Sequence, residues 1–500
     1  MNTRLLICYL FFFPCILASP ASDAPAVPRK PNILFILTED QGTHVGCLGT
    51  PGLQTPHMDE LARRGLLFRN AFVAYPVCSS SKACLYTGRH NHDTGLLNNT
   101  VNYHKPADKL TPKELNNPLY LRNRIRAEIP TLIERLHEAG YYQGVTHKLH
   151  VAPVEKFPYD EFLQEQNGPA MKGFLQRAAK VGKPWFLLYN IPNTHRPYPN
   201  SDNVKIRVDP SAVKPPPYLP DTPVVRKDWS EYLAGIEVAD GLVGQALGAL
   251  REAGEAGRTV VIFMGDHGPT FQHGKMTPYD LGLRIPFIWS GPGIRAGQTD
   301  ALASELDVMP TLLDLAGLET PKGLHGVSLR KVLEGQSDAK PRSLVFAEVS
   351  NKGNLPNNGM QERAVFDGRW KLIYREKTDP PWRQVQADSK EWPTWGNRTY
   401  AETVRVKEQF PEAYRTLQGL DPQSLGGKVP ALELYDLQAD PDELRDLSAD
   451  PACTAERARL MAALRRWVTD TGDPAITPSC EPTQAPPFQN GYHGGPKPGG

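Results

Sequence analysis

The chain has 500 residues, which exceeds an average single domain, and 40% of them are hydrophobic and 22% charged. This composition is typical of a soluble globular protein with a large buried core. The formal net charge is only +1, which excludes a global electrostatic attraction to nucleic acid or to a membrane surface. A polyanionic partner would need a local cluster of basic residues instead.

The first 22 residues have the layout of a signal peptide. A short polar start with Arg4 precedes an almost entirely apolar stretch over residues 5–17, and small residues follow up to Ser22. That stretch is short for a membrane-spanning helix, although an uncleaved membrane anchor is the alternative. We therefore predict a signal peptide over residues 1–22. The mature protein would be secreted or periplasmic, or lysosomal in an animal, with no membrane association after cleavage.

Alternating strands and helices predict one large α/β domain over residues 30–342. Three continuous apolar runs are typical of parallel strands that are buried on both faces: residues 33–37, 185–191 and 259–264. Helical spacing of apolar residues is found at 55–65, 131–139, 227–253 and 307–316. Each apolar run leads into acids, amides or histidines, and ligands bind at that edge of an open α/β sheet.

After residue 342 the pattern changes to short strands with alternating polarity. We predict an antiparallel sheet from residues 344–348, 363–366, 370–374 and 432–437. Asp367-Gly368 is predicted as the two-residue turn of a hairpin within it, and a helix at about 455–467 as its cover. These elements predict a smaller C-terminal α+β domain over residues 343–475. The tail at 481–500, rich in Pro, Gly and Gln, is predicted to be disordered.

The cysteines outside the predicted signal peptide are odd in number. The chain has seven, and Cys8 and Cys15 lie in the signal, which leaves five. An exported protein with an odd count keeps at least one free thiol. The absence of a Cys-x-x-Cys pair argues against structural zinc and thioredoxin-like chemistry. A disulfide between Cys453 and Cys480 is left open.

One of these cysteines, Cys78, begins the most informative stretch of the chain. It is flanked by serines and followed by a run that is compatible with a helix. At a helix N-terminus the backbone N–H groups and the macrodipole favour an anion. Lys82, four residues later, faces the same side as Cys78. Without further context, the pair would be interpreted as a buried structural cysteine beside a solvated lysine.

The run from Cys78 to Lys82, followed by Thr87-Gly88-Arg89, resembles the type I sulfatase signature Cys-x-Pro-x-Arg and Thr-Gly-Arg. The resemblance implies that a formylglycine-generating enzyme oxidises Cys78 to formylglycine (3-oxoalanine), whose hydrate attacks sulfur. It also implies an alkaline-phosphatase-like large domain with a central, mostly parallel sheet flanked by helices. Two positions depart from the signature: Ser80 replaces Pro or Ala, and Lys82 replaces Arg.

Two further pairs resemble the metal ligands of this family. Glu39-Asp40 follows the first strand, where the family has Asp-Asp, and Asp266-His267 follows the third. The resemblance implies that these side chains, with Cys78, hold Ca²⁺, or Mg²⁺ as the alternative. A flexible oxygen-coordinating site can accommodate the longer Glu39. An acid pair after a strand would otherwise be interpreted as loop surface.

Three more motifs resemble catalytic blocks of the family. His147-Lys148-Leu149-His150 resembles Gly-Lys-x-His, and two residues at this spacing on an extended segment project to one face. The motifs around His195 and Lys275 resemble the substrate histidine and a sulfate-binding lysine. The implied roles are charge compensation by Lys82, Lys148 and Lys275, protonation of the leaving group by His195, and collapse of the sulfated intermediate with His150 as base.

Residues 148–160 and 213–223 are similar to the N-sulfoglucosamine sulfohydrolases (heparan N-sulfatases, or sulfamidases), which implies N-sulfoglucosamine of heparan or heparin fragments as substrate. His273-Gly274-Lys275 is closer to the general sulfatase pattern. Three alternatives stay open: an O-sulfatase on another sulfated polysaccharide, a phosphonate or phosphate-ester hydrolase of the same superfamily, and a non-catalytic glycan-binding relative. The implied partners are a sulfated glycan and the maturation enzyme, without nucleic acid, and a homodimer is left open.

Overall fold

The computed structural model describes residues 30–198, 208–336, 339–350, 361–376, 378, 398–477 and 480. The predicted signal peptide and the predicted disordered tail lie outside these residues. The described residues from Pro31 onward belong to one compact unit. It contains an eight-stranded sheet and a four-stranded sheet, so the predicted fold class is confirmed.

The eight-stranded sheet has the strand order β4-β3-β5-β1-β6-β7-β2-β8. At its centre β1 (Asn32–Thr38) pairs in parallel with β5 (Trp185–Ile191) and β6 (Thr259–Gly265), and all three are buried throughout. They match the three predicted apolar runs. A strand that is covered on both faces exposes no residue to solvent, so all of its residues can be apolar. Only β7 among the eight strands runs antiparallel to its neighbours. The outer strands are β2 (Leu66–Phe72), β3 (Tyr142–Thr146), β4 (Glu161–Leu163), β7 (Phe287–Ser290) and β8 (Gly297–Ser304).

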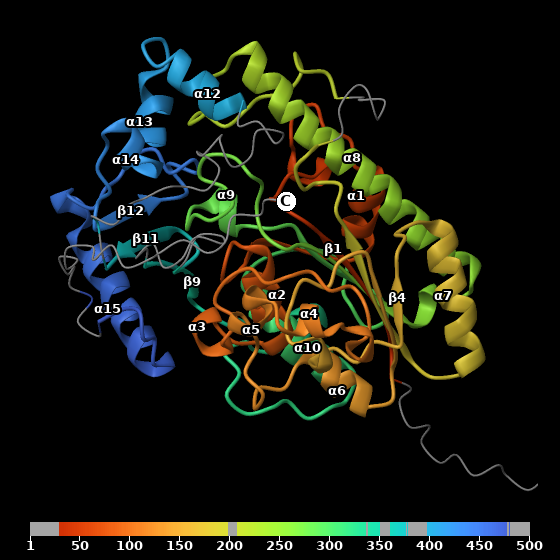
Figure 1. The fold of residues 1–500 in the computed structure, drawn as a ribbon. Coiled ribbons are helices and arrows are strands. Elements are labelled where there is room, and N and C mark those ends of the chain that lie inside the picture. The colour runs from red at the N-terminus through yellow and green to blue at the C-terminus, as the bar shows by residue number, and fades with distance from the viewer. Residues whose placement is uncertain are drawn as a thin grey trace, which may run out of the picture. The chain divides into compact units, whose positions relative to one another are not determined.

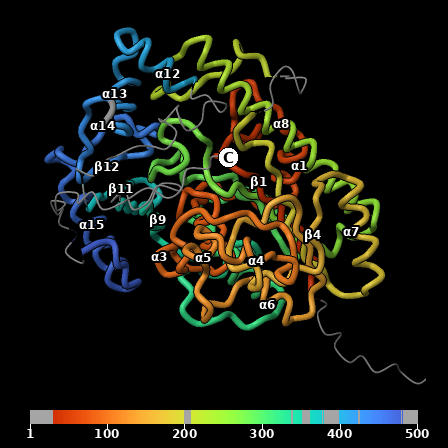
Figure 2. Tube along the Cα trace, viewed as in Figure 1, coloured from red at the N-terminus to blue at the C-terminus, as the bar shows by residue number. Residues whose placement is uncertain are grey.

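Helices cover both faces of this sheet (Figure 1). Ile33, Phe35 and Leu37 of β1 pack in one apolar core, and Leu34 and Ile36 pack in another, because successive strand residues point to opposite faces. Figure 2 shows α1, α7 and α8 on one side of β1 and α4, α5 and α6 on the other. The first core includes α2 (Cys78–Thr87), α6 (Leu132–Glu138) and α10 (Val308–Leu315), and the second includes α1 (Pro56–Arg64), α7 (Gly168–Val181) and α8 (Pro223–Glu252).

The long helix α8 begins at Pro223 rather than at residue 227 as predicted. The Thr222 side chain accepts a hydrogen bond from the Val225 N–H, and Pro223 takes the first helical position, which together form a strong start signal. By length and composition α8 could cross a membrane, but 56% of its most apolar window is buried inside the fold. We interpret it as a core helix.

The four-stranded sheet is antiparallel, with the order β12-β11-β10-β9. Its strands β9 (Val345–Val349), β10 (Glu362–Phe366), β11 (Trp370–Arg375) and β12 (Leu432–Asp436) match the predicted ones within one or two residues. Helix α15 (Thr454–Thr471) packs on it through Leu460, Leu464 and Trp467. The remaining described helices are α3 (Asn91–Thr94), α4 (Pro112–Leu115), α5 (Pro118–Arg122), α9 (Asp280–Leu283), α11 (Arg330–Leu333), α12 (Arg398–Arg405), α13 (Pro411–Leu420), α14 (Pro422–Leu425) and the 3₁₀ turns η1 (Gly46–Leu48), η2 (Ala107–Lys109), η3 (Val154–Lys156), η4 (Ala256–Arg258), η5 (Glu305–Asp307) and η7 (Pro451–Cys453).

The hairpin turn between β10 and β11 lies one residue later than predicted. Phe366 pairs with Lys371, and the Asp367 N–H donates to the Trp370 carbonyl, so Gly368 and Arg369 are the central turn residues. The Asp367 carboxylate accepts the Arg369 and Trp370 N–H groups at 2.8 and 2.7 Å, and Gly368 takes a φ of 102°. Asp367 therefore caps the turn from its first position.

The cysteines in the described part of the chain, Cys47, Cys78, Cys84, Cys453 and Cys480, are all free thiols. The disulfide that the sequence left open, between Cys453 and Cys480, is not formed. Both side chains instead belong to the apolar core between α15 and the four-stranded sheet.

Candidate active site

Polar side chains meet at the carboxyl edge of the three central strands. Asp40 follows β1 and Asp266 follows β6, and the Asp40 N–H donates to Asp266 Oδ1 at 2.8 Å. The Asp266 N–H donates in turn to the Thr38 carbonyl at 2.9 Å. These two hydrogen bonds hold the two residues side by side, because neighbouring parallel strands end at the same edge of the sheet.

Four buried side chains with metal-ligating atoms gather there: Asp40, Cys78, Asp266 and His267. Their ligand atoms all lie within 4.8 Å of one another. His267 Nε2 is 3.5 Å from Asp40 Oδ1, 3.6 Å from Asp266 Oδ1 and 3.3 Å from Cys78 Sγ. His267 Nδ1 lies 2.9 Å from the Gly268 carbonyl oxygen, which can only accept, so Nδ1 carries a proton and donates it. Nε2 is then the ring nitrogen that can bind a metal ion.

The charge of this cluster also fits a divalent cation. Burial, with the Glu39 carboxylate nearby, raises the pKa of Asp266 to about 6. Two adjacent buried carboxylates destabilise each other unless a cation lies between them. Carboxylate oxygens and one imidazole form a donor set that binds hard or borderline divalent metals.

Glu39, the remaining predicted ligand, lies outside this group of four. Its carboxylate accepts hydrogen bonds from Lys82 Nζ at 2.7 Å, from Asn190 Nδ2 at 2.7 Å and from Lys148. Burial alone would raise its pKa, but Lys148 and Lys82 outweigh burial and hold the pKa of Glu39 well below its usual range. In this arrangement Glu39 contacts two lysines, and its role as a metal ligand stays a prediction.

Cys78 is the first residue of α2, and only 2% of it is exposed. Lys275 Nζ lies 3.2 Å from its sulfur and 2.9 Å from Asp40 Oδ1. Burial alone would raise the pKa of the thiol, but Lys148, Lys275 and His267 outweigh burial and hold the pKa of Cys78 well below its ordinary value. The position of the sulfur is therefore built to stabilise an anion.

Lys82 lies one turn after Cys78 and bridges two acids. Its ammonium is 2.7 Å from Glu39 Oε1 and 2.8 Å from Asp266 Oδ2, and it is fully buried. Burial opposes its charge, but Asp266 and Glu39 raise the pKa of Lys82 well above its ordinary value. Lys82 thus neutralises charge on the two carboxylates by direct contact. Its effect on Cys78 is a longer-range electrostatic one.

The segment that carries Lys148 and His150 is not extended, contrary to the prediction. His147 and His150 take φ values of 57° and 51°, so the chain turns sharply after β3. The glycine that the family pattern has at position 147 is explained by this left-handed backbone. The prediction was wrong because a two-residue spacing says nothing about φ.

His150 nevertheless lies beside Cys78, and the two side chains interact. Its Nε2 is 2.9 Å from the Thr100 carbonyl, which can only accept, so Nε2 carries the proton. Its buried Nδ1 has no hydrogen-bond partner among the described residues. Burial and then Lys148 lower the pKa of His150, while Cys78 opposes them, which favours the neutral ring with a lone pair on Nδ1.

His195 lies after β5, with its Nε2 4.0 Å from Asp40 Oδ2 and 27% of its side chain exposed. The neighbouring Arg196, which the sequence analysis did not single out, anchors the segment. Its guanidinium donates to both carboxylate oxygens of Asp228 at 2.8 Å and lies 4.3 Å above the Tyr198 ring. No local pattern could have indicated this pairing, because Asp228 lies on α8.

His273, near Lys275 in the sequence, has a structural position. Its ring stacks on Tyr279 with centroids 3.8 Å apart and lies 4.6 Å from the Tyr218 ring. Burial, with Lys371 and Arg375, lowers the pKa of His273 to about 3. Tyr279 in turn donates to Glu433 of the four-stranded sheet at 3.0 Å. His273 therefore helps to fasten the Lys275 loop to that sheet.

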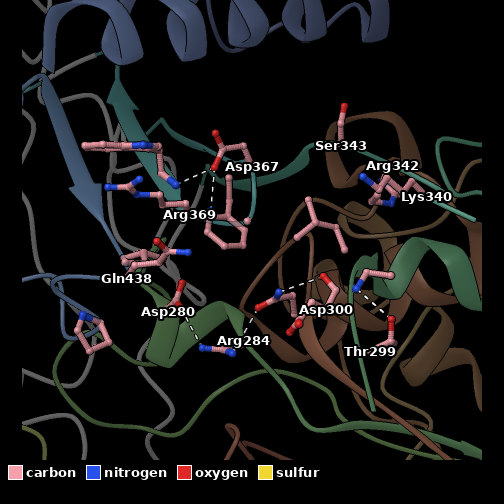
Figure 3. A pocket seen from close by; sticks show the side chains of 18 of the residues that line it. Asp280, Arg284, Thr299, Asp300, Lys340, Arg342, Ser343, Asp367, Arg369 and Gln438 are labelled. Carbon is pink, nitrogen blue, oxygen red and sulfur yellow. Dashed lines mark hydrogen bonds and ion pairs between the residues drawn. The ribbon is translucent and has the colours of Figure 1, made fainter. Parts of the chain in front are cut away.

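A cavity of about 1090 Å³ has walls from β8 and from the β10–β11 hairpin (Figure 3). None of the predicted site residues lines it. Its arginines have acidic partners, for example Arg284 with Asp280 at 3.8 Å and Arg459 with Glu456 at 2.7 Å. Its mixed, paired charges do not mark it as the site of the predicted chemistry.

Comparisons with known proteins match residues 31–318 to the sulfatase family and residues 265–411 to the C-terminal region of N-sulphoglucosamine sulphohydrolase. The chain is 29% identical to the N-sulphoglucosamine sulphohydrolase of Homo sapiens, over 91% of this chain and 95% of that protein. It is 26% identical to an ulvan-active sulfatase of Formosa agariphila, over 91% and 77% respectively. A solved phosphonate monoester hydrolase from Silicibacter pomeroyi has a TM-score of 0.64 at 18% identity, over 89% of this chain and 96% of that one, and shows the shared fold alone.

Proposed function

The chain belongs to the sulfatase family of hydrolases, and we propose that it releases sulfate from sulfated glycans, with N-sulfoglucosamine of heparan or heparin fragments as its substrate. The observation that carries this proposal is the environment of Cys78. Its buried sulfur lies 3.2 Å from Lys275 Nζ and 3.3 Å from His267 Nε2. Such a position stabilises the negative charge of a bound sulfate and of the group that attacks it.

Two groups complete the proposed chemistry. Cys78 oxidised to formylglycine would supply an aldehyde hydrate as nucleophile, and a Ca²⁺ or Mg²⁺ ion held by Asp40, Asp266, His267 and residue 78 would polarise the sulfate oxygens. Lys275 and Lys148 would bind the sulfate oxygens. Lys82 would keep the acids beneath it ionised, in keeping with its contacts to Glu39 and Asp266.

Two histidines are placed for proton transfer. His150 would accept a proton at Nδ1, because its Nε2–H is already donated to the Thr100 carbonyl. His195 is half-buried near Asp40, and from there it would give a proton to the leaving amine or alcohol. The donor and the acceptor thus come from the segments after β5 and β3 respectively.

The narrower substrate assignment rests on the sequence matches. The likeness to N-sulphoglucosamine sulphohydrolase extends over most of the chain and includes its C-terminal region. A second candidate is an O-sulfatase on another sulfated polysaccharide, which the likeness to the ulvan-active sulfatase favours. Both candidates use the same site, so they differ only in the sugar and in the leaving atom.

A substrate panel separates these candidates. Sulfate release should be faster from a disaccharide with non-reducing N-sulfoglucosamine than from one with 6-O-sulfated N-acetylglucosamine, measured by ion chromatography. Release from O-sulfated sugars alone would refute the narrower assignment and leave the sulfatase assignment standing. Faster hydrolysis of a phosphonate monoester than of any sulfate would favour a phosphonate hydrolase. No turnover by formylglycine-containing protein would indicate a glycan-binding relative.

We also propose that the protein is exported, since the signal-like segment 1–22 precedes the fold. Maturation of Cys78 would then require a formylglycine-generating enzyme in the same compartment or before export. Cell fractionation with an antibody against the mature chain tests this, and a cytoplasmic full-length protein would contradict it.

A further inference from the structure

Glu305 is a buried carboxyl group that the proposed mechanism does not use. It opens the 3₁₀ turn η5 and is 1% exposed. Its Oε1 accepts the Ala74 N–H at 2.7 Å, in the loop that leads into α2. Its Oε2 lies 2.7 Å from the Oγ of Ser81, one turn after Cys78. Glu305 therefore touches both the entrance and the first turn of the helix that begins with Cys78.

The contacts of Ser81 fix the location of one proton. Its Oγ is 2.6 Å from the Asp266 backbone carbonyl and 2.7 Å from Glu305 Oε2, and both are normal O–H···O lengths. A serine hydroxyl has one proton to donate, and a carbonyl can only accept. When Ser81 donates to the Asp266 carbonyl, the second short contact is a hydrogen bond only if Glu305 carries a proton. A carboxylate in that place would face a lone pair of Ser81.

The charge around Glu305 agrees with a neutral carboxylic acid. Among the described residues no lysine, arginine or histidine forms an ion pair with it, while Asp266 lies nearby and its charge opposes ionisation. Burial is the main cause that raises the pKa of Glu305 to about 8, and it outweighs the contacts with Ser81 and with the Ala74 and Tyr75 N–H groups, which lower the pKa. Ionisation would add a further buried negative charge beside an already acidic cluster.

We propose that Glu305 is a positioning residue which stays protonated and, through Ser81, fixes the start of α2 against Asp266, the residue that follows β6. The chain of bonds runs from the Ala74 N–H to Glu305, from Glu305 to Ser81, and from Ser81 to the Asp266 carbonyl. It joins the helix of the nucleophile position to the strand of a metal-ligating position. Glu305 touches no reacting group, and its effect on turnover rests on the proposed function.

Three variants test this role. In Glu305→Gln the amide oxygen can accept from Ala74 and the NH₂ group can donate to Ser81, so kcat should stay within about threefold of the wild type. Glu305→Ala removes these two bonds and the one from the Tyr75 N–H, and should lower kcat by about 10- to 100-fold with little change in KM, because misplacement rather than lost binding is responsible. Glu305→Asp, which is too short to span both partners, should resemble Glu305→Ala. Thermal unfolding of each variant checks that it is folded.

A second readout does not depend on sulfatase activity. The infrared difference spectrum of wild type minus Glu305→Gln at neutral pH should contain the C=O stretching band of a protonated carboxylic acid. Absence of that band, or a Glu305→Gln variant as impaired as Glu305→Ala, would overturn the proposal. If the protein releases no sulfate from any substrate, the proposed function fails while the infrared band still decides the protonation of Glu305.

Discussion

Ser80 is the third residue of α2, and its buried hydroxyl has no hydrogen-bond partner among the described residues. An unpartnered buried polar group destabilises a protein by about 1–3 kcal/mol, and a proline is tolerated in the first turn of a helix. We therefore expect Ser80→Pro to raise the melting temperature by about 1–4 °C, measured by differential scanning calorimetry. Ser80→Ala is the control that removes the hydroxyl alone, and a lower melting temperature in both variants would contradict this account.

The residues that sequence could indicate are those fixed by the ends of strands. Asp40 and Asp266 follow continuous apolar runs, so their meeting at one edge follows from parallel pairing alone. The partners of Glu39 could not be predicted in this way, because two lysines from distant segments each bind one oxygen of its carboxylate. The protonation of Glu305 was also beyond the sequence, since it follows from distances around Ser81.

At the scale of elements, the ion pair between His92 of α3 and Glu348 of β9 joins the two sheet regions, with His92 Nδ1 3.0 Å from Glu348 Oε2. Burial alone would lower the pKa of His92, but Glu348 outweighs burial and raises it, with Asp473 adding to and Arg363 opposing the effect. A raised folded pKa means that the native state favours the charged ring. This stabilisation is complete below the ordinary pKa of about 6.5 and is lost as pH rises through the raised value.

His92→Gln keeps a donor toward Glu348 without a titrating group. We expect the free energy of unfolding of the wild type to fall more steeply than that of His92→Gln between about pH 6 and pH 8. Urea unfolding at several pH values measures both slopes. Equal slopes would mean that the ionisation of His92 is not linked to folding.

Helices and strands with strong local signals were predictable, and those defined by their neighbours were not. Thr131 and Glu134 form a capping box that begins α6 at the predicted place. In contrast, the hairpin after β10 is shifted because the Asp367 side chain caps the turn from outside its centre. The turn at residues 147–150 was missed because its positive φ values occur at histidines rather than glycines.

For the whole molecule, the clustered ligands predict a requirement for a divalent metal. Asp266→Ala should lower kcat by more than about 100-fold while the protein stays folded, because the cation is lost together with its charge. Exhaustive chelation should abolish sulfate release, and added Ca²⁺ or Mg²⁺ should restore it. Asp300→Ala, in the wall of the separate cavity, is the matched control. Full activity after chelation would contradict the metal site.

The arrangement of the molecule was predictable in outline, as an α/β sheet followed by an antiparallel sheet. The sequence could not indicate that side chains of the four-stranded sheet hold a loop of the active site. Lys371 of β11 binds Glu443 at 2.8 Å and also pairs with Asp280, next to the tyrosine that stacks on His273. These contacts hold the loop of Lys275, and they depend on side chains that lie 72 and 91 residues from Lys371 in the sequence.

The central claim is that Cys78 becomes the nucleophile of a sulfatase, and the state of this residue tests it most directly. The measurement is peptide mass spectrometry of the Cys78 peptide in active protein from its native host or from a host with the maturation enzyme. We expect an aldehyde in place of the thiol, a converted fraction that rises with specific activity across preparations, and no activity in Cys78→Ala. Active protein that contains only unmodified cysteine at position 78 would contradict the account.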